Sequence, residues 1–324
     1  MADAAQARQI VVIRNASAGA GCTADFAGNL ADRFLALGLS ADVKLAASGD
    51  ELVEAAERVV REGATTVVAG GGDGTLNAVA SALTSTAVAF GVIPLGTLNH
   101  FAKDLNIPLD LEGAILTIAL GHSRQVDTGE INGRLFLSNS SLGLYPDTVR
   151  ERERQQKRLG RGKWLAFFWA AVAALRRYPF LDLTISLDDD VYQRRTPFIF
   201  IGNNEYLMEG FNIGARERLD AACLSLYMVQ RTGRLGLLAL GVRALLGRLQ
   251  QAKDFDGLLA KDILIETRHK KIRVSTDGEV TLMQSPLQYR IRPAALKVIV
   301  PKKNLPKGSQ AVARRRKGML ASVA

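Results

Sequence analysis

The feature that most constrains the fold is a glycine-rich segment that directly follows a short apolar strand. Residues 70–77 read Gly-Gly-Gly-Asp-Gly-Thr-Leu-Asn, a strand is predicted at 66–69, and a helical pattern continues to about residue 83. Glycines let backbone amides approach a phosphate closely, and the helix N-terminus adds the positive end of its dipole. The order strand, glycine turn, helix therefore predicts a phosphate-binding loop.

The glycine spacing separates this loop from two better-known phosphate loops. No Lys-Ser/Thr pair follows the glycines, as a Walker loop requires, and the spacing differs from the dinucleotide fingerprint. A purely structural glycine turn is the alternative, and the strand–turn–helix context argues against it. The candidate phosphate-binding residues are Gly71, Gly72, Asp73, Gly74, Thr75, Leu76 and Asn77.

Strand and helix patterns alternate through the first part of the chain. Strands are predicted at 10–13, 41–45, 66–69 and 88–93, and helices at 26–37, 51–61 and 74–83. Such alternation builds a parallel sheet that helices cover on both faces. We therefore predict a Rossmann-like α/β nucleotide-binding domain over residues 1–125.

After about residue 121 the pattern changes to period-two segments joined by turn signals. Asn132-Gly133 lies between two apolar segments, 126–131 and 135–139, which is typical of a hairpin. Alternating apolar residues recur at 183–187, 263–265, 272–274 and 287–291. We predict a second, β-rich domain over 126–301, an antiparallel β-sandwich. Residues 302–324 carry seven basic residues and no acid, which indicates a basic tail with little packing.

A second polar segment follows the strand at 88–93. Residues 94–105 read Pro-Leu-Gly-Thr-Leu-Asn-His-Phe-Ala-Lys-Asp-Leu. Thr97 and Asn99 place a hydroxyl and an amide at the carboxyl end of a parallel strand, where open α/β sheets bind ligands. A helix N-cap at Thr97 is the structural alternative, and both roles are compatible.

Together these segments resemble a family of lipid kinases. The glycine segment is similar to the GGDGT signature shared by diacylglycerol kinases, sphingosine kinases and NAD kinases. Residues 94–105 resemble the PxGTxNDFAR stretch of bacterial diacylglycerol kinases, with His100 in place of the family's Asp. The resemblance implies ATP and Mg²⁺ as cofactors and a lipid hydroxyl as acceptor. It also adds Asn15, in a segment similar to the family's NPxSG, to the nucleotide site.

A third segment, Asp277-Gly278-Glu279, supplies candidate catalytic carboxylates. On its own, Asp-Gly between two apolar segments is typical of a hairpin turn. In the family, a DGE near the end of the second domain supplies the catalytic carboxylate. Glu279 or Asp277 would then take the proton of the attacking hydroxyl, and Asp73 would act near the metal and the phosphates. The sequence does not assign these roles between the carboxylates.

The chain differs from the family's sequence at a stretch that helps to hold a structural metal ion. Residues 219–224 are similar to the family's LDDGxL stretch, which helps to hold a structural Mg²⁺. In this chain Ala221 and Ala222 replace the second Asp and the Gly, so Asp220 is the remaining acidic residue. Because Mg²⁺ requires oxygen ligands, we expect this site to be weakened or absent.

The net charge of +10 indicates an anionic partner. Residues 150–163 hold seven basic and two acidic residues, and aromatic residues follow within 164–169. This arrangement favours peripheral binding to an anionic membrane surface, although a solvated face of a core helix is the alternative. We expect no nucleic-acid partner. The oligomeric state is left open, with a homodimer as one option.

The location is predicted to be cytoplasmic, with peripheral membrane association. Two cysteines are too few for a disulfide framework, the first residues do not resemble a secretory leader, and the longest uncharged stretches are shorter than the ~20 residues that span a bilayer.

The sequence thus predicts an ATP-dependent lipid kinase acting on a diacylglycerol-like hydroxyl. Two alternatives stay open. An NAD kinase-like enzyme would share the glycine motif but is disfavoured by residues 94–105. A non-catalytic nucleotide- or lipid-sensing module is suggested by His100 and Ala221.

Overall fold

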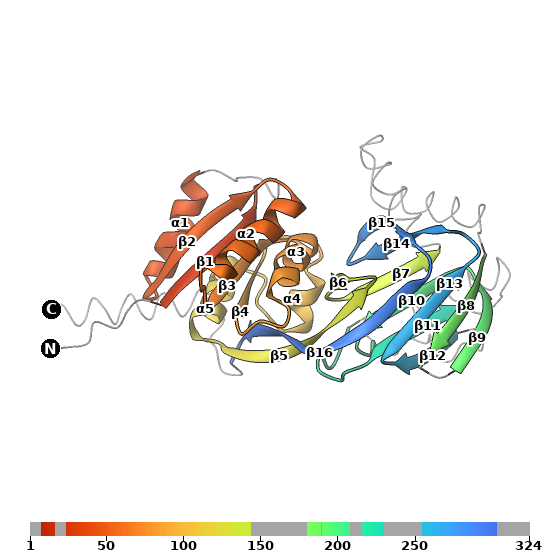
Figure 1. Ribbon diagram of the computed structural model, residues 1–324. Helices are drawn as coiled ribbons and strands as arrows, with labels where there is room; N and C mark the ends of the chain where they lie inside the picture. Colours follow the sequence, from red (N-terminus) through yellow and green to blue (C-terminus); the bar gives the residue numbers. More distant parts are fainter. Residues whose placement is uncertain are drawn as a thin grey trace, which may run out of the picture. The chain divides into compact units, whose positions relative to one another are not determined.

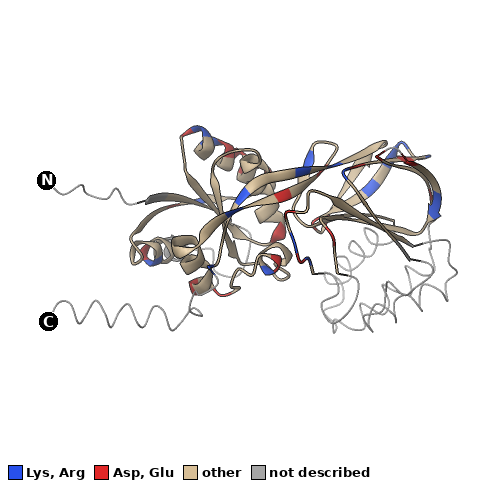
Figure 2. Cartoon of the chain, turned by 90° about the horizontal axis from the view of Figure 1, so that it is seen from below, with Lys and Arg blue, Asp and Glu red and all other residues tan. Residues whose placement is uncertain are grey.

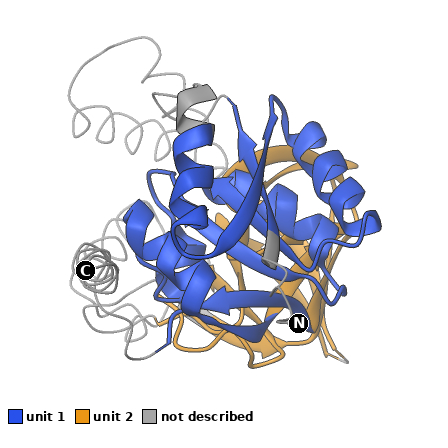
Figure 3. Cartoon of the chain, turned by 90° about the vertical axis from the view of Figure 1, so that its left-hand side faces the viewer, with its two compact units in different colours: residues 1–126, 294–324 blue, residues 127–293 orange. Residues whose placement is uncertain are grey.

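The computed structural model describes residues 8–16, 24–143, 180–188, 190–207, 215–229 and 255–302. The chain forms two compact units, residues 1–126 with 294–324 and residues 127–293 (Figure 3). The predictions for residues 150–163, 164–169 and 303–324 lie outside the described residues. No helix in the described part of the chain combines the length and the apolar character needed to cross a bilayer.

The first unit contains a parallel sheet with the strand order β2-β1-β3-β4-β16. Its strands are β1 (Arg8–Asn15), β2 (Leu39–Ala46), β3 (Thr66–Gly71), β4 (Ala89–Pro94) and the end of β16 (Leu287–Val300). β3 and β4 are buried along their whole length, as expected for central strands of a sheet covered on both faces.

Helices cover both faces of this sheet (Figure 1). Apolar side chains of α1 (Ala24–Leu35) and α5 (Leu111–Leu120) pack on one face, against Ile10, Val12 and Val68. α2 (Gly49–Arg61) and α3 (Asp73–Leu83) pack against each other and against β1 and β3. The predicted α/β architecture is therefore confirmed.

The sequence explains the limits of α2. The Ser48 side chain accepts a hydrogen bond from the backbone N–H of Glu51 (3.2 Å), and the Glu51 carboxylate accepts one from Ala47 N–H (2.7 Å). This reciprocal capping satisfies N–H groups that the helix cannot pair internally. At the other end of the helix, Gly63 has a φ of 87°, a conformation that favours glycine.

The second unit is a sandwich of two antiparallel sheets. One has the order β12-β11-β10-β7-β14-β15, and the other contains β16, β13, β8 and β9 in that order. The strands are β7 (Asn139–Gly143), β8 (Leu181–Leu187), β9 (Asp190–Thr196), β10 (Phe198–Asn203), β11 (Leu224–Val229), β12 (Phe255–Ala260), β13 (Asp262–Thr267), β14 (Lys271–Thr276) and β15 (Glu279–Gln284). Apolar side chains from both sheets form one core, in which the rings of Phe136 and Tyr289 meet edge to face. The predicted β-sandwich is confirmed.

Two tight turns match their sequence signals. Asn132 (φ 45°) and Gly133 (φ 82°) join β5 (His122–Ile131) to β6 (Arg134–Phe136), and Asp277 (φ 48°) and Gly278 (φ 88°) join β14 to β15. Positive φ at both central residues is the reason for Asn-Gly and Asp-Gly.

The structure differs from the sequence prediction at two strands. The strand expected at 135–139 is broken, because β6 ends at Phe136 and β7 begins at Asn139 in the other sheet. Likewise, the sequence assigned all residues up to 301 to the second domain, whereas β16 passes into the first unit at Ala294 and pairs there with β4.

Candidate functional site

The glycine loop lies where ligands of open α/β sheets bind. It joins the carboxyl end of β3 to α3, while the neighbouring strand β1 continues toward α1 on the opposite face. The strand order therefore reverses between β1 and β3, and ligands bind outside the carboxyl ends of the strands at such a point.

Close backbone approach requires glycine at two positions of this site. A Cβ on Gly96 would lie 2.5 Å from the Cα of Gly72 and 2.8 Å from Asn99 Oδ1. A Cβ on Gly71 would lie 2.5 Å from the side chain of Thr75. The loops after β3 and β4 thus touch backbone to backbone and form one surface, as a phosphate cradle requires.

The N-terminus of α3 supplies the donors. Leu76 N–H donates to Gly72 O (3.0 Å) and begins the helical hydrogen bonding, so the N–H groups of Asp73, Gly74 and Thr75 precede it and point out of the helix end. The Leu76 side chain is fully buried and its N–H is used within the helix. Leu76, which the sequence analysis included among the candidates, therefore belongs to the core.

The loop after β4 is closed by Asn99. This residue is buried, has a φ of 52°, accepts from Gly96 N–H through Oδ1 (3.0 Å) and donates to Gly96 O (2.9 Å). Its amide therefore shapes the turn. Asn99 is also the N-cap position of α4 (His100–Asp104), so the alternative of a helix N-cap at Thr97 is corrected. The Thr97 side chain is exposed.

Asp73 joins the two loops. Its Oδ1 accepts from Phe101 N–H over a long distance of 3.5 Å, and its side chain is half-buried. Asn77, one turn further along α3, and Asn15, at the end of β1, are also half-buried. The structure thus brings Asp73, Asn77 and the glycine loop to the start of one helix.

A buried arginine beside the loop was missed from the sequence. Arg14 is 4% exposed, pairs in register with Gly70, and has side-chain carbons within 3.8 Å of where a Cβ on Gly70 would lie. The available signal was a basic residue at the end of an apolar strand. A guanidinium here adds positive charge next to a proposed phosphate site.

In the second unit, the carboxylate of Asp277 is held by backbone amides. It accepts hydrogen bonds from the N–H groups of Leu137 (2.7 Å), Ser138 (2.8 Å) and Asn139 (3.0 Å). Burial raises the pKa of this carboxyl, while those donors and the guanidinium of Arg216 oppose the rise. Asp277 therefore ties the β14–β15 turn to the segment between β6 and β7.

Arg216 holds the same segment from its carbonyl side. It is 5% exposed, and its Nη1 donates to Leu137 O (2.8 Å) and to Asn203 O (2.9 Å). Its guanidinium also lies over the ring of Tyr206, 5.5 Å from the centroid. Arg216 was missed from the sequence, because nothing local marks a basic residue that two further charged residues follow as buried.

Glu279, two residues after Asp277, has a different environment. It is the first residue of β15, its side chain is exposed, and its Oε2 accepts from Arg134 Nη2 (2.8 Å). The two carboxylates of the DGE segment therefore differ in access: backbone donors surround Asp277, whereas Glu279 faces solvent.

The residues around Asp220 pair with other protein groups. Asp220 Oδ1 accepts from Arg218 Nε (3.1 Å), in an ion pair whose arginine side chain is largely exposed. Ala222 keeps a φ of 54°, which favours glycine, and donates its N–H to Asp127 Oδ2 (2.7 Å). Within the described ranges, no three His, Cys, Asp or Glu side chains are grouped as metal ligands.

Comparison with known families matches both parts of the chain. The model of the diacylglycerol kinase catalytic domain matches residues 9–131, and that of the YegS C-terminal NAD kinase beta sandwich-like domain matches residues 146–300. A diacylglycerol kinase of Staphylococcus aureus (strain Newman) is 31% identical over 186 residues, which are 57% of this chain. The alignment spans 58% of that relative's length.

Solved structures share the fold. A diacylglycerol kinase structure from Bacillus anthracis aligns with a TM-score of 0.67 and 19% identity, covering 92% of this chain and 98% of that chain. Another structure from the same organism aligns with a TM-score of 0.73 and 22% identity, covering 92% and 99%. At these identities, the likeness supports the fold alone.

Proposed function

Since this chain belongs to the diacylglycerol kinase family, we propose that it is a lipid kinase that transfers the terminal phosphoryl group of ATP to the hydroxyl of a diacylglycerol-like lipid. One observation carries the proposal. The Gly70–Thr75 loop opens α3 at the carboxyl end of β3 and touches the Gly96 loop backbone to backbone. This is the geometry of a phosphate cradle on an α/β sheet.

The first unit would hold the nucleotide. The N–H groups of Asp73, Gly74 and Thr75 would donate to phosphate oxygens, and the positive end of the α3 dipole would add to the attraction. A Mg²⁺ ion held there would neutralise charge on the phosphates, and one or two protein carboxylates commonly help to hold such an ion. Asp73, half-buried at the start of the helix, fits this requirement.

The second unit would supply the group that takes the proton of the acceptor hydroxyl. A general base must be reachable by that hydroxyl. The Glu279 carboxylate is exposed and has one ion-pair partner, whereas three backbone N–H groups surround the Asp277 carboxylate. We therefore assign proton acceptance to Glu279. Asp277 would hold the turn in place.

An acceptor panel tests the proposed function. The full chain is incubated with ATP labelled at the terminal phosphate, Mg²⁺ and, in separate reactions, diacylglycerol, a sphingoid base, phosphatidylglycerol or NAD. Labelled product from a lipid alcohol supports the proposal. Product from NAD alone would favour an NAD kinase-like enzyme, and ATP binding without any product would favour a non-catalytic sensing module.

Variants of Glu279 test the assignment of the base. Glu279→Gln should lower turnover by about 100-fold or more with ATP affinity unchanged, as expected when a general base is lost. Glu130→Gln is the matched control, because Glu130 forms an ion pair of the same length, 2.8 Å with Arg292, in the same unit. Wild-type turnover in Glu279→Gln would make Asp277 the better candidate.

A further inference from the structure

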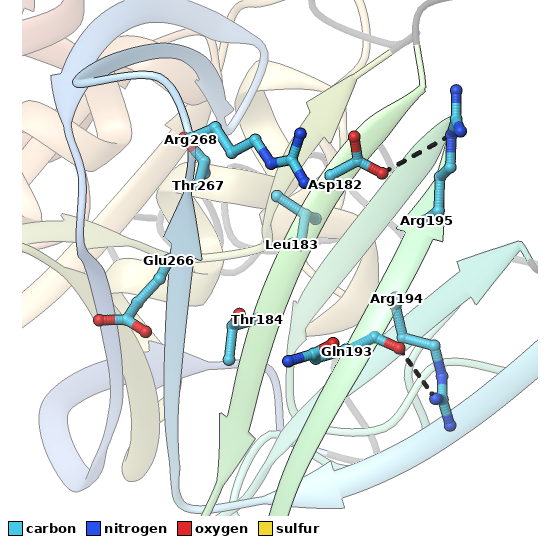
Figure 4. A pocket seen from close by; sticks show the side chains of 9 residues that line it. All are labelled: Asp182, Leu183, Thr184, Gln193, Arg194, Arg195, Glu266, Thr267 and Arg268. Atoms are coloured by element: carbon cyan, nitrogen blue, oxygen red, sulfur yellow. Dashed lines mark hydrogen bonds and ion pairs between the residues drawn. The ribbon is translucent and has the colours of Figure 1, made fainter.

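The outer faces of the two sheets in the second unit differ in charge. Over β8, β9 and β13, a hollow is lined by two carboxylates, Asp182 and Glu266, and by two guanidinium groups, Arg195 and Arg268 (Figure 4). In the other sheet, β7, β10 and β11 carry no Lys, Arg, Asp or Glu and are tan throughout in Figure 2. A ligand on the outer face of these three strands would therefore meet neutral groups.

A row of four residues crosses this neutral face from strand to strand. In the strand register, Phe200 of β10 lies beside Ser141 of β7, Ser141 lies beside Ser275 of β14, and Ser275 lies beside Val280 of β15. The residues that precede or follow the row on β7, β10 and β14 belong to the core between the sheets. Because side chains alternate along a strand, the row faces outward. Ser141 and Ser275 are called the serine pair below.

The hydroxyls of the serine pair are buried but are not used by the protein. Ser141 is 0% exposed and Ser275 is 2% exposed, and within the described residues neither Oγ has a hydrogen-bond partner. Ser140, which precedes Ser141 and faces the core, instead shares a hydrogen bond with Tyr289 Oη (3.1 Å). Because a buried hydroxyl without a partner destabilises the fold, such a group in a native protein calls for an explanation. A bound ligand that accepts both hydroxyls supplies one.

The surroundings of the serine pair fit a neutral carbonyl oxygen between hydrocarbon groups. Directly opposed residues of neighbouring strands have Cβ atoms about 4.5–5.5 Å apart, so both hydroxyls can reach one carbonyl oxygen, whose two lone pairs accept them. The row itself holds no cation for a phosphate and no carboxylate for an ammonium group, and Arg273 lies one row further along β14, opposite Leu282. Phe200 and Val280, on either side of the serine pair, are half-buried apolar side chains. An ester of a fatty acid has this combination of groups.

We propose that the serine pair binds an ester carbonyl of the acceptor lipid and so selects glycerolipids with ester-linked chains over sphingoid bases and ether lipids. The proposal rests on the proposed function, because the ligand is the acceptor of that reaction. In the β14–β15 register, the pair Ser275–Val280 is next to the pair Thr276–Glu279, so one hairpin carries both the ester site and the proposed base.

The lipid would reach these two groups around the end of the sheet. Side-chain alternation places Glu279 on the face opposite to Ser275, but Glu279 begins β15 beside the turn and is exposed there. In a diacylglycerol, an ester-bearing carbon is the neighbour of the carbon that carries the hydroxyl, so the glycerol would span the sheet end. The hydroxyls of the serine pair are closed to solvent in the free chain, so the lipid must displace the atoms that cover them.

Lipid binding by the full chain without ATP tests the ester site independently of catalysis. The probes are a labelled short-chain diacylglycerol and its diether analogue, in which a CH₂ group replaces each ester carbonyl, both dispersed in detergent. The test variant is Ser141→Ala with Ser275→Ala. The control is Ser140→Ala, which removes the hydroxyl of the neighbouring residue on the core side of the same strand.

The wild type should bind the diester about tenfold or more tightly than the diether, because two hydrogen bonds to the carbonyl are lost in the analogue. In the test variant this preference should fall to about twofold or less, whereas Ser140→Ala should keep it. Three results would overturn the proposal: no preference for the diester in the wild type, an unchanged preference in the test variant, or tighter binding of a sphingoid base than of the diester.

Thermal unfolding without lipid is a second readout, which separates a binding role from a structural one. Loss of two unpartnered hydroxyls should leave the Tm of the test variant equal to or above that of the wild type. Ser140→Ala should lower Tm by about 2–6 °C, because the buried Tyr289 hydroxyl loses its partner. A test variant that lost as much Tm as Ser140→Ala would show that the protein itself uses these hydroxyls, and the proposal would be refuted.

Failure of the proposed function can be told apart from failure of the ester site. If the wild type transferred no phosphate from ATP to diacylglycerol, the proposed function would be refuted. The preference for the diester is measured without ATP, so it would still decide whether the serine pair binds an ester.

Discussion

Removal of the Asp277 carboxylate should destabilise the second unit more than its position in a surface turn suggests. In Asp277→Ala, the backbone N–H groups of Leu137, Ser138 and Asn139 lose their acceptor. Leaving a buried donor unsatisfied costs about 1–3 kcal/mol, and water reaches part of this turn, so we expect a total loss near 3 kcal/mol. For a domain of this size, such a loss lowers Tm by about 6–12 °C.

The assay is thermal unfolding of the full chain, with Asp262→Ala as the control. Asp262 belongs to the same unit and forms an exposed ion pair with Arg290 (3.0 Å), whose removal should cost at most about 1 kcal/mol. Asp277→Ala should also lower turnover, because the turn carries Glu279, whereas Glu279→Gln should lower turnover with Tm unchanged. If Asp277→Ala had the same Tm as the Asp262→Ala control, the carboxylate would not organise this segment and its structural role would be refuted.

Three further predictions concern other parts of the chain. Gly72→Val should abolish ATP binding in a nucleotide titration, because a β-branched side chain would stand where the loop backbone must approach the phosphates. The protein should still fold, because a Cβ on Gly72 lies 3.4 Å from Gly96 Cα, and Gly49→Val, with nothing within 4 Å, should bind ATP normally. Ala222→Gly should raise the free energy of unfolding by about 0.5–1 kcal/mol by relieving a φ of 54°, while Ala221→Gly should lower it by a similar amount in denaturant unfolding. Burial and nearby carboxylates raise the pKa of the Cys223 thiol above its ordinary 9.0. Its rate of alkylation, followed by peptide mass spectrometry, should therefore still rise above pH 9.0, because the thiolate is the reacting form. A rate that reaches its plateau by pH 9.0 would contradict this.

Elements were predictable where apolar residues recur with a clear period against a polar side. The alternation in β8 and the apolar stripe of α2 each have a polar side, so their period is visible in sequence. α5 was missed because its residues Gly113–Ile118 are all buried, which leaves little polar face to reveal a helical period. The path of β16 through both units was also hidden, because strand periodicity does not report which strands become neighbours.

The candidate site was predictable only where local backbone requirements dictate the residue. The glycine loop and the Asp277-Gly278 turn need conformations or close approaches that glycine and aspartate supply, so their sequence is informative. The tasks of Arg14 and Arg216 depend on neighbours distant in sequence, and nothing local marks them as buried. The use of the Asn99 amide within its own turn was not predicted either, although its partner Gly96 lies only three residues away.

The most direct test of the central claim is the initial rate at which the labelled terminal phosphate of ATP enters short-chain diacylglycerol dispersed in detergent. It should be measured for the wild type and Gly72→Val at equal ATP concentration. The account predicts labelled phosphatidic acid from the wild type and a rate lower by about 100-fold or more in the variant, because the cradle no longer stabilises the transferred group. Equal rates in both proteins, or no lipid product from the wild type in the presence of Mg²⁺, would contradict it.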